Sequence, residues 1–274
     1  MVDVKDTITG IDYSYHLEPR VKKNFDRWKE DVIKKDTDKV VLVDGRERSG
    51  KSLLTFQFAR YIDPSFCIDR ICFTPSDFLR AIRDAKKGQV VVFDEAFRGL
   101  SSKSSISKIN KSVVQAMMEC GQRNLILFIV LPTFFLLETY AATLRSNDLV
   151  HVFVGRSGRR GYKVYSERLK AKLYHHGKKR GFDYSFPTTR MTGKFYNKWV
   201  INEQEYREKK NQALMDITDG KVDELVEDDT MFLMKAIKEL KEKNKYTWKR
   251  IGEALGKDGH AIEMRYFRHS PLIL

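Results

Sequence analysis

The sequence predicts an α/β fold with a parallel central sheet. From Lys39 onward, apolar runs of strand length alternate with segments that have helical periodicity. The first run, residues 40–43, is apolar at every position, which is typical of a strand covered on both faces. Helical segments between successive strands imply right-handed crossovers, and such crossovers connect parallel strands.

Five apolar runs are predicted to form the strands of this sheet: residues 40–43, 67–73, 90–93, 125–131 and 149–154. The most apolar stretch, residues 125–137, contains Pro132 and is shorter than the ~20 residues that cross a bilayer. The first residues of the chain are polar and charged, unlike a signal peptide. We therefore expect no membrane span and a cytoplasmic location.

Helices are predicted around these strands from apolar spacing and from start and stop signals. One follows the first strand and ends at Asp63, and another begins at Thr74. The remaining predicted helices carry Val113, Met117 and Cys120 before the fourth strand and Leu136, Tyr140 and Leu144 before the fifth. A further helix before the first strand carries Val21, Phe25, Trp28 and Val32 and is expected to pack on the core or on a neighbouring molecule.

The composition indicates a globular protein with an anionic partner. The 274 residues fit one ordinary domain and a smaller appendage, and 42% of them are apolar, which is enough for a core. The formal net charge of +14 favours a polyanion, with nucleic acid ahead of acidic lipid. A solubilising surface charge is the simpler alternative. The cysteines Cys67, Cys72 and Cys120 have no metal-ligand spacing, which fits reduced, buried thiols.

Changes in composition along the chain predict five segments. They are an N-terminal helical segment (1–36), an α/β core (37–155), a basic extension (156–220), an acidic linker (221–229) and a small C-terminal three-helix domain (230–274).

A phosphate-binding signature follows the first predicted strand directly. Its residues are Gly45, Arg46, Glu47, Arg48, Ser49, Gly50, Lys51 and Ser52. The pattern Gly-x4-Gly-Lys-Ser between a strand and a helix is the P-loop, or Walker A motif, in which backbone N–H groups and the helix N-terminus face phosphates. We expect Lys51 to reach the β- and γ-phosphates and the Ser52 hydroxyl to ligate magnesium.

A second candidate element, Asp94-Glu95, ends the strand at residues 90–93. In the Walker B role, Asp94 holds the magnesium ion through its shell and Glu95 orients or deprotonates the attacking water. A plain turn is the alternative. A helix and a strand separate the two motifs, which is typical of the additional-strand, catalytic-glutamate ATPases. No Asn-Lys-x-Asp stretch follows, which disfavours a GTPase. The sequence thus predicts hydrolysis of ATP with Mg²⁺.

Two further catalytic roles have candidate residues. Thr133, at the end of the fourth strand, is a candidate sensor of the γ-phosphate, and capping the next helix is the equal alternative. A ring ATPase also needs a cation supplied to the neighbouring subunit's phosphate. Arg145 is the first candidate, Arg123 and Arg98 are the others, and each could be an ordinary surface charge.

The residues 90–97, the helix ending at 120–124 and the apolar strand ending at Pro132 resemble the FtsK/HerA-like DNA-pumping ATPases. Within that superfamily, the chain looks most like the zonular-occludens-toxin-like and viral DNA-packaging branches. The resemblance covers about residues 40–154. It implies a homo-oligomeric ring, often hexameric, that moves DNA with ATP hydrolysis, together with viral portal or other mobile-element proteins as partners.

Two parts outside the resemblance are candidates for contact with DNA. Residues 156–198 are densely basic and contain several aromatic residues, a composition suited to a phosphate backbone or unpaired bases. The aromatic residues could equally pack this segment onto the core. The tail has a Trp-x-x-Ile-Gly-x-x-Leu-Gly core typical of helix-turn-helix units, with a protein-docking module as the alternative. The candidate DNA contacts are Arg159, Arg160, Lys178, Lys179, Arg180, Arg265 and Arg268.

Three functions follow from this combination of motifs. The leading hypothesis is an ATP-driven DNA translocase or packaging motor whose terminal module selects DNA. The first alternative is an ATP-dependent switch, such as a DNA-bound regulator or a helicase loader. The second is a phage assembly or secretion ATPase whose substrate is protein.

Overall fold

The computed structural model describes residues 1–94, 103–218, 241, 247–249 and 258–269. By its internal contacts the chain divides into two compact units, residues 1–213 and 214–274, which are treated separately below.

The first unit is built on a seven-stranded sheet of order β4-β5-β6-β3-β7-β8-β9. The strands β4 to β7 are parallel where they pair, and β8 and β9 continue the sheet in antiparallel pairing. An α/β fold with a mostly parallel central sheet is confirmed. The strand bounds are β3 Lys39–Gly45, β4 Ile71–Cys72, β5 Val90–Phe93, β6 Ile126–Val130, β7 Asp148–Val154, β8 Arg160–Tyr165 and β9 Thr192–Lys194.

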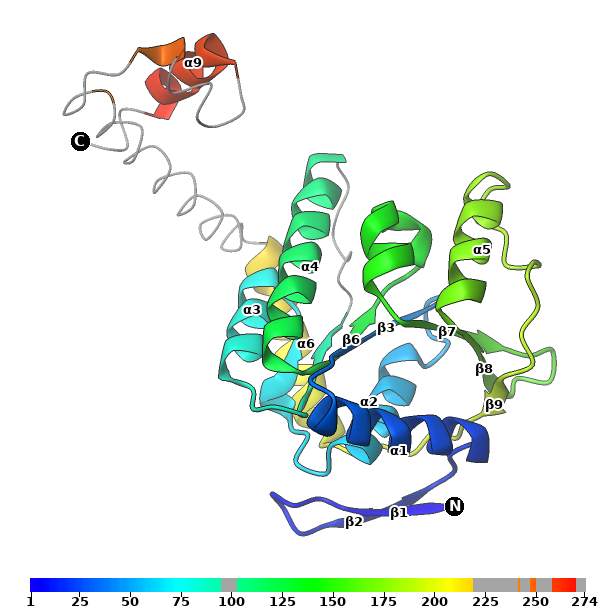
Figure 1. Ribbon diagram of the computed structural model, residues 1–274. Helices are drawn as coiled ribbons and strands as arrows, with labels where there is room; N and C mark the ends of the chain where they lie inside the picture. Colours follow the sequence, from blue (N-terminus) through cyan, green and yellow to red (C-terminus); the bar gives the residue numbers. More distant parts are fainter. Residues whose placement is uncertain (95–102, 219–240, 242–246, 250–257, 270–274) are drawn as a thin grey trace. The chain divides into compact units, whose positions relative to one another are not determined.

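Helices cover both faces of this sheet, with α1 and α2 below it and α4 and α5 above it in Figure 1. The helix bounds are α1 Pro19–Lys34, α2 Lys51–Ile62, α3 Pro75–Asp84, α4 Lys103–Arg123, α5 Glu167–Lys178 and α6 Glu203–Thr218. A separate hairpin, β1 (Val2–Lys5) and β2 (Asp12–Tyr15), precedes α1.

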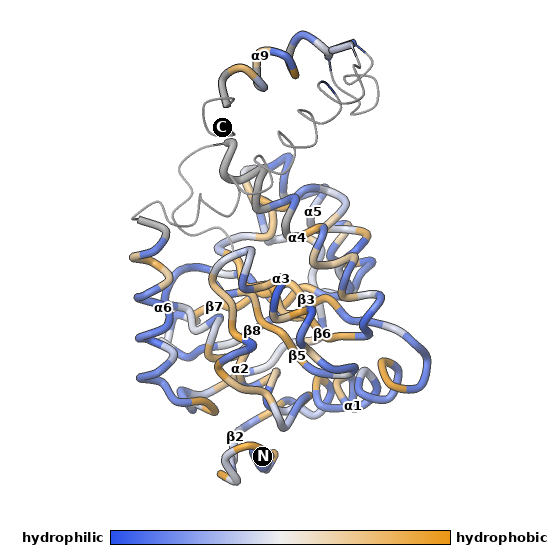
Figure 2. The backbone as a smooth tube through the Cα atoms, turned by 90° about the vertical axis from the view of Figure 1, so that its left-hand side faces the viewer, coloured by the Kyte–Doolittle hydropathy of each residue, from blue (hydrophilic) through white to orange (hydrophobic). Residues whose placement is uncertain are grey.

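The continuous apolar strands are explained by two cores, one on each face of the sheet. In β3, Val41 and Val43 belong to the core that contains α1 and α2, while Val40 and Leu42 belong to the core that contains α3, α4 and α5. All four side chains are fully buried. Figure 2 shows the hydrophobic colouring concentrated in these central strands, as burial on both faces requires.

Two predicted elements differ from the structure. The strand expected at 67–73 is reduced to β4, because Ile68–Arg70 form a 3₁₀ turn and the buried Arg70 pairs with Asp63. The helix expected around 136–144 is a 3₁₀ turn (Phe134–Leu136) followed by a π-helix (Tyr140–Arg145). The Asn110 amide donates to the carbonyl of Leu136 and accepts from the backbone N–H of Glu138, so these two backbone groups are satisfied where the 3₁₀ turn ends.

The segment expected as a basic extension belongs to the same sheet. Residues 155–158 form a tight turn, and β8 pairs with β7 along its whole length. The boundary expected at residue 155 therefore falls inside the sheet, between β7 and β8. The charged side chains in this stretch hide the strand pattern, because β8 has only Tyr162, Val164 and Tyr165 as large apolar residues.

The described part of the second unit contains α9, Gly259–His269. Ile262 is buried, and the Trp248 ring lies 5.4 Å from the Tyr266 ring. The burial of Ile262 and the contact of Tyr266 agree with an apolar face of α9 that packs inside this unit. The other helices of the tail and the acidic linker lie outside the described residues, so the three-helix domain stays a prediction.

No helix in the described part of the chain is both long and apolar enough to cross a membrane. The three cysteines are free thiols, and burial raises the pKa of Cys72 to about 12.

The buried ion pair of Arg60 and Asp6 connects the N-terminal hairpin to α2. Arg60 Nη2 lies 2.9 Å from Asp6 Oδ2, and both side chains are almost fully buried. Arg60 also donates to the carbonyls of Val200 and Pro64. One guanidinium thus joins the hairpin, α2 and the segment before α6.

We expect Arg60→Met to lower the free energy of unfolding by about 3–5 kcal/mol, because it leaves the Asp6 carboxylate buried without its cation. Urea denaturation measures this change. The double variant Asp6→Asn/Arg60→Met should recover part of the loss, and Arg20→Met, at an exposed position, should change little. An unfolding curve of Arg60→Met that overlays the wild type would contradict this account.

Candidate nucleotide-binding site

The candidate site lies at the carboxyl edge of the parallel strands. β3, β5 and β6 are adjacent and in register, so the residues that follow them meet at one edge of the sheet. These residues are the loop after Gly45, Asp94 after β5, and Thr133 after β6. Crevices at the carboxyl ends of parallel strands are the usual ligand sites of open α/β sheets.

Two glycines give the loop its shape. Gly45 has φ +139°, and a Cβ there would lie 2.1 Å from the carbonyl oxygen of Val152 on β7. Gly50 has φ +96° and forms the N-cap of α2, where a Cβ would meet the Phe195 ring at 3.1 Å. Only glycine fits both the backbone conformation and the space at these positions. The loop backbone therefore lies close to β7 and to Phe195, the residue after β9, and leads into the N-terminus of α2.

Lys51 and Ser52 are positioned by contacts around the loop. Lys51 Nζ donates to the carbonyls of Gly45 at 2.8 Å and Arg46 at 2.9 Å, so its ammonium group lies over the loop. Ser52 Oγ donates to Asp94 Oδ1 at 3.0 Å. The Walker A hydroxyl and the Walker B carboxylate, 42 residues apart in the sequence, are thus brought together by the fold.

Asp94 is also held from its other side by Tyr206, a residue that sequence reasoning missed. The Tyr206 hydroxyl donates to Asp94 Oδ2 at 2.7 Å, and Asp94 is fully buried. The Tyr206 ring packs edge-on against Phe56 of α2 at 5.1 Å, and Lys210 Nζ donates to the Tyr206 hydroxyl. Since Tyr206 lies in the highly charged α6, only its aromatic character set it apart in the sequence.

A second buried carboxylate, Asp44, lies one residue before the loop. Its Oδ1 is 2.9 Å from His151 Nδ1, and its Oδ2 accepts from the backbone N–H of Phe134 and from the Tyr184 hydroxyl. Tyr184 stacks on His151 with ring centroids 4.1 Å apart. Burial, followed by the Asp44 charge, raises the pKa of Tyr184 well above its ordinary value, so its hydroxyl stays protonated and donates.

Thr133 joins this network and also caps a turn. Its hydroxyl lies 2.9 Å from the Tyr184 hydroxyl and accepts from the backbone N–H of Phe135. The capping role is therefore present, and the role as a phosphate sensor stays a prediction. Through Tyr184 and Asp44, the end of β6 is connected to the residue that precedes the P-loop.

The candidates for a trans-acting arginine have other partners. Arg145 forms an ion pair with Asp38 and donates to the carbonyl of Met117. Asp38 precedes β3, so this pair lies at the amino edge of the sheet, opposite the P-loop. Arg123 donates to the carbonyl of Arg83. Because Arg145 and Arg123 are both bound to groups of their own chain, these contacts do not support either as the arginine that acts on a neighbouring subunit. That role stays a prediction. Arg98 lies outside the described residues, as does Glu95.

The residues present fit a nucleotide with magnesium. Ser52 and Asp94 supply one hydroxyl and one carboxylate, and Mg²⁺ at phosphate sites takes its remaining ligands from water and phosphate oxygens. The described residues contain no cluster of three His, Cys, Asp or Glu that could hold a metal by itself. The donor set therefore suits Mg²⁺ bound together with phosphates, rather than a metal bound by protein ligands alone.

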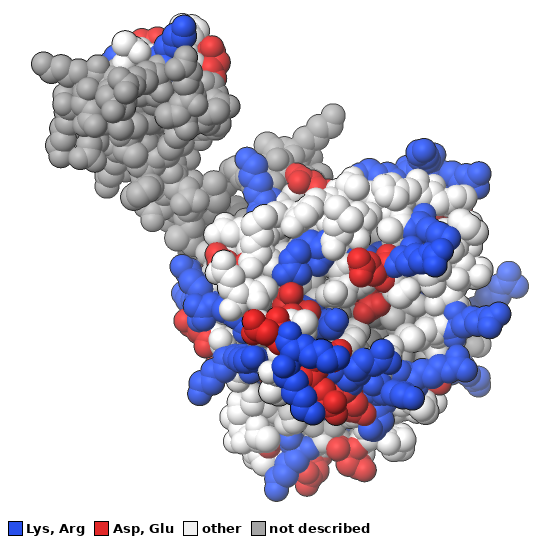
Figure 3. Space-filling model, viewed as in Figure 1, with Lys and Arg blue, Asp and Glu red and all other residues white. Residues whose placement is uncertain are grey.

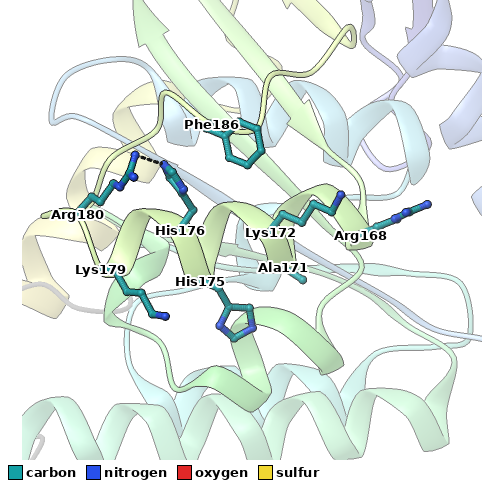
Figure 4. Close-up of a pocket in the computed structure, with 8 residues that line it drawn as sticks. All are labelled: Arg168, Ala171, Lys172, His175, His176, Lys179, Arg180 and Phe186. Atoms are coloured by element: carbon teal, nitrogen blue, oxygen red, sulfur yellow. Dashed lines mark hydrogen bonds between the residues drawn. The ribbon is translucent and has the colours of Figure 1, made fainter.

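The candidate DNA contacts of the first unit lie on β8 and around the end of α5. Arg159 and Lys179 are exposed, and Arg160 is half-buried. An open pocket runs along α5, with Lys172, His176 and Phe186 facing one another (Figure 4). The residues that line the pocket are Arg168, Ala171, Lys172, His175, His176, Lys179, Arg180 and Phe186.

The other predicted DNA contacts have a mixed outcome. Lys178 is exposed, but its Nζ donates to the Tyr174 hydroxyl and lies 4.7 Å from the centre of that ring. Arg265 lies in α9, but its side chain, like that of Arg268, is outside the described residues. On the face seen in Figure 3, Lys and Arg are spread widely with acidic side chains among them.

No protein-family model matches the chain, and no curated protein matches it. Among solved structures, the N-terminal domain of zonular occludens toxin from Neisseria meningitidis is similar at 16% sequence identity with a TM-score of 0.31, over 47% of this chain and 84% of that one. The VirB11 ATPase of the Brucella suis type IV secretion system, in complex with sulphate, is similar at 15% identity with a TM-score of 0.33. That match covers 57% of this chain and 56% of the other. The assignment of a nucleotide to the site rests on the chain's own residues.

We expect Tyr206→Phe to lower the free energy of unfolding by about 1–3 kcal/mol, because one oxygen of a fully buried carboxylate loses a donor. Because Asp94 is then less firmly oriented, the gain in nucleotide affinity on adding Mg²⁺ should also shrink. Urea denaturation and calorimetric titration with and without Mg²⁺ measure the two effects. Tyr196→Phe is the matched control, since Tyr196 is 66% exposed. Equal behaviour of the two variants would refute the role of Tyr206.

Tyr184→Phe tests the connection between Thr133 and Asp44. Loss of the hydroxyl removes a hydrogen bond to a buried carboxylate and one to Thr133, and we expect the unfolding free energy to fall by about 1.5–3 kcal/mol. Thermal and urea denaturation measure the change, with Tyr140→Phe at a partly exposed position as the control. A loss below about 0.5 kcal/mol would show that the network contributes little.

Proposed function

We propose that the protein is a magnesium-dependent ATPase that hydrolyses ATP to ADP and phosphate. The observation that carries this proposal is the hydrogen bond from Ser52 to the fully buried Asp94, beside a loop whose carbonyls bind Lys51. A P-loop and a Walker B carboxylate in this arrangement provide the parts of a nucleoside triphosphate site.

In this proposal each residue has a defined task. The N–H groups of the loop and the N-terminus of α2 bind the phosphates, and Lys51 exchanges the loop carbonyls for phosphate oxygens. Ser52 and Asp94 hold the magnesium ion, which when bound offsets the charge that develops on the phosphates. Glu95 accepts a proton from the attacking water, and Tyr206 keeps Asp94 in its orientation.

We further propose that hydrolysis moves DNA, with the chain acting as a homo-oligomeric ring. The support is the net charge of +14 and the basic pocket along α5. Lys172, Lys179 and Arg180 supply charge for a phosphate backbone there, and the half-exposed Phe186 ring is available for a base to stack upon. Arg265 and Arg268 of α9 are proposed as further DNA contacts, and viral portal or other mobile-element proteins as further partners.

Steady-state ATP hydrolysis with and without single- and double-stranded DNA tests this function. We expect DNA to raise the turnover rate severalfold. Glu95→Gln should lower turnover by at least about 100-fold while ATP still binds, because a general base contributes about that much to the rate. Lys179→Ala/Arg180→Ala should weaken DNA stimulation and its salt dependence, with Arg20→Ala as an exposed control.

Other outcomes would separate the alternatives. Turnover that DNA leaves unchanged would rule out the motor and leave an ATP-dependent switch or an ATPase that acts on protein. An absence of any ATP turnover in the wild type, with Mg²⁺ present, would refute the ATPase itself.

A further inference from the structure

Arg160, a candidate DNA contact in the sequence, lies against the P-loop in the fold. Its Cδ is 3.3 Å from the position that a Cβ on Gly50 would occupy. Gly50 directly precedes Lys51 and forms the N-cap of α2. The Arg160 side chain therefore passes beside the part of the loop where phosphates are expected to bind.

The backbone of Arg160 is fixed by the sheet. Arg160 begins β8 and pairs with Val154 of β7, and its carbonyl accepts from the backbone N–H of Phe195. Phe195 is buried and its ring also contacts the Gly50 position, at 3.1 Å. Strand pairing and ring packing thus hold the start of the Arg160 side chain at the loop, independently of any ligand.

The guanidinium of Arg160 is available for an anion. Among the described residues, no hydrogen bond or ion pair is found for it, although the side chain is half-buried. A guanidinium stays charged at any ordinary pH, and its planar donors suit phosphate oxygens. The same loop carries Lys51 and the exposed Arg46 and Arg48, against the single acidic residue Glu47. This concentration of cations at a helix N-terminus favours a polyphosphate.

We propose that Arg160 is a nucleotide-binding residue, supplied by the same chain, that contacts the phosphates of the ATP held by the P-loop. The assignment to DNA suggested by its place in the basic segment is replaced by this role. The inference rests on the proposed ATPase function. It makes the start of β8 and the residue after β9 one wall of the nucleotide site, with Arg160 and Phe195 beside the loop.

Calorimetric titration of the full chain with ATP tests the inference, using Arg159→Ala as the matched control. Arg159 is the adjacent residue and is exposed. We expect Arg160→Ala to weaken ATP binding by about 10-fold or more, as loss of a charge-assisted contact would, and Arg160→Lys to lie between it and the wild type. Arg159→Ala should bind ATP within about twofold of the wild type. Circular dichroism verifies folding, and Arg160→Gln carries the test if the alanine variant does not fold.

Affinity for DNA, measured without nucleotide, separates the two roles of Arg160. If Arg160→Ala weakens DNA binding and leaves ATP binding unchanged, the inference is overturned and the DNA assignment stands. Equal ATP affinities of the Arg159 and Arg160 variants also overturn it. Lys51→Ala distinguishes the failure of the proposed function. If the wild type binds ATP no better than Lys51→Ala, the nucleotide site itself is refuted. If Lys51→Ala weakens ATP binding and Arg160→Ala does not, only the role of Arg160 is refuted.

Discussion

The hydrogen bonding of Asp94 is the constraint on which the rest of the site depends. A carboxylate with no exposure to solvent is costly unless donors surround it, and the fold supplies Ser52 from α2 and Tyr206 from α6. Each donor comes from a different helix packed on the same face of the sheet. The position of α6 is therefore tied to the chemistry at the P-loop, and the packing of Tyr206 on Phe56 orients the hydroxyl.

The buried Asp44 is a second carboxylate that connects elements around the site. It connects the end of β3 with the residues after β6 through Phe134, with the middle of β7 through His151, and with Tyr184. Both carboxylates accept from a tyrosine hydroxyl in a later part of the chain. Polar groups buried in this way specify one arrangement of the elements, since other arrangements leave a charge without donors.

The parts of the site that are encoded by short, contiguous stretches could be predicted from the sequence. The P-loop, Asp94 and the strands around them follow from short motifs and continuous apolar runs, and the strand at 90–93 matches β5 in both bounds. Tyr206 and Tyr184 were not predictable, because their partners are 112 and 140 residues away and hydrogen bonds over such separations leave no pattern. β8 was hidden by its charges, and the turn before the π-helix is bonded at Leu136 and Glu138 by a distant amide, Asn110.

The pairing of β8 with β7 has a consequence for how the chain folds during synthesis. The segment that carries the P-loop and Asp94 ends with β7. A chain that stopped there would expose the backbone edge of this seven-residue apolar strand. Such an edge pairs readily with other chains. While the ribosome adds the next residues, the tight turn at 155–158 lets β8 cover this edge as soon as it emerges. A fragment that ends at the motif boundary leaves this edge uncovered and should therefore aggregate.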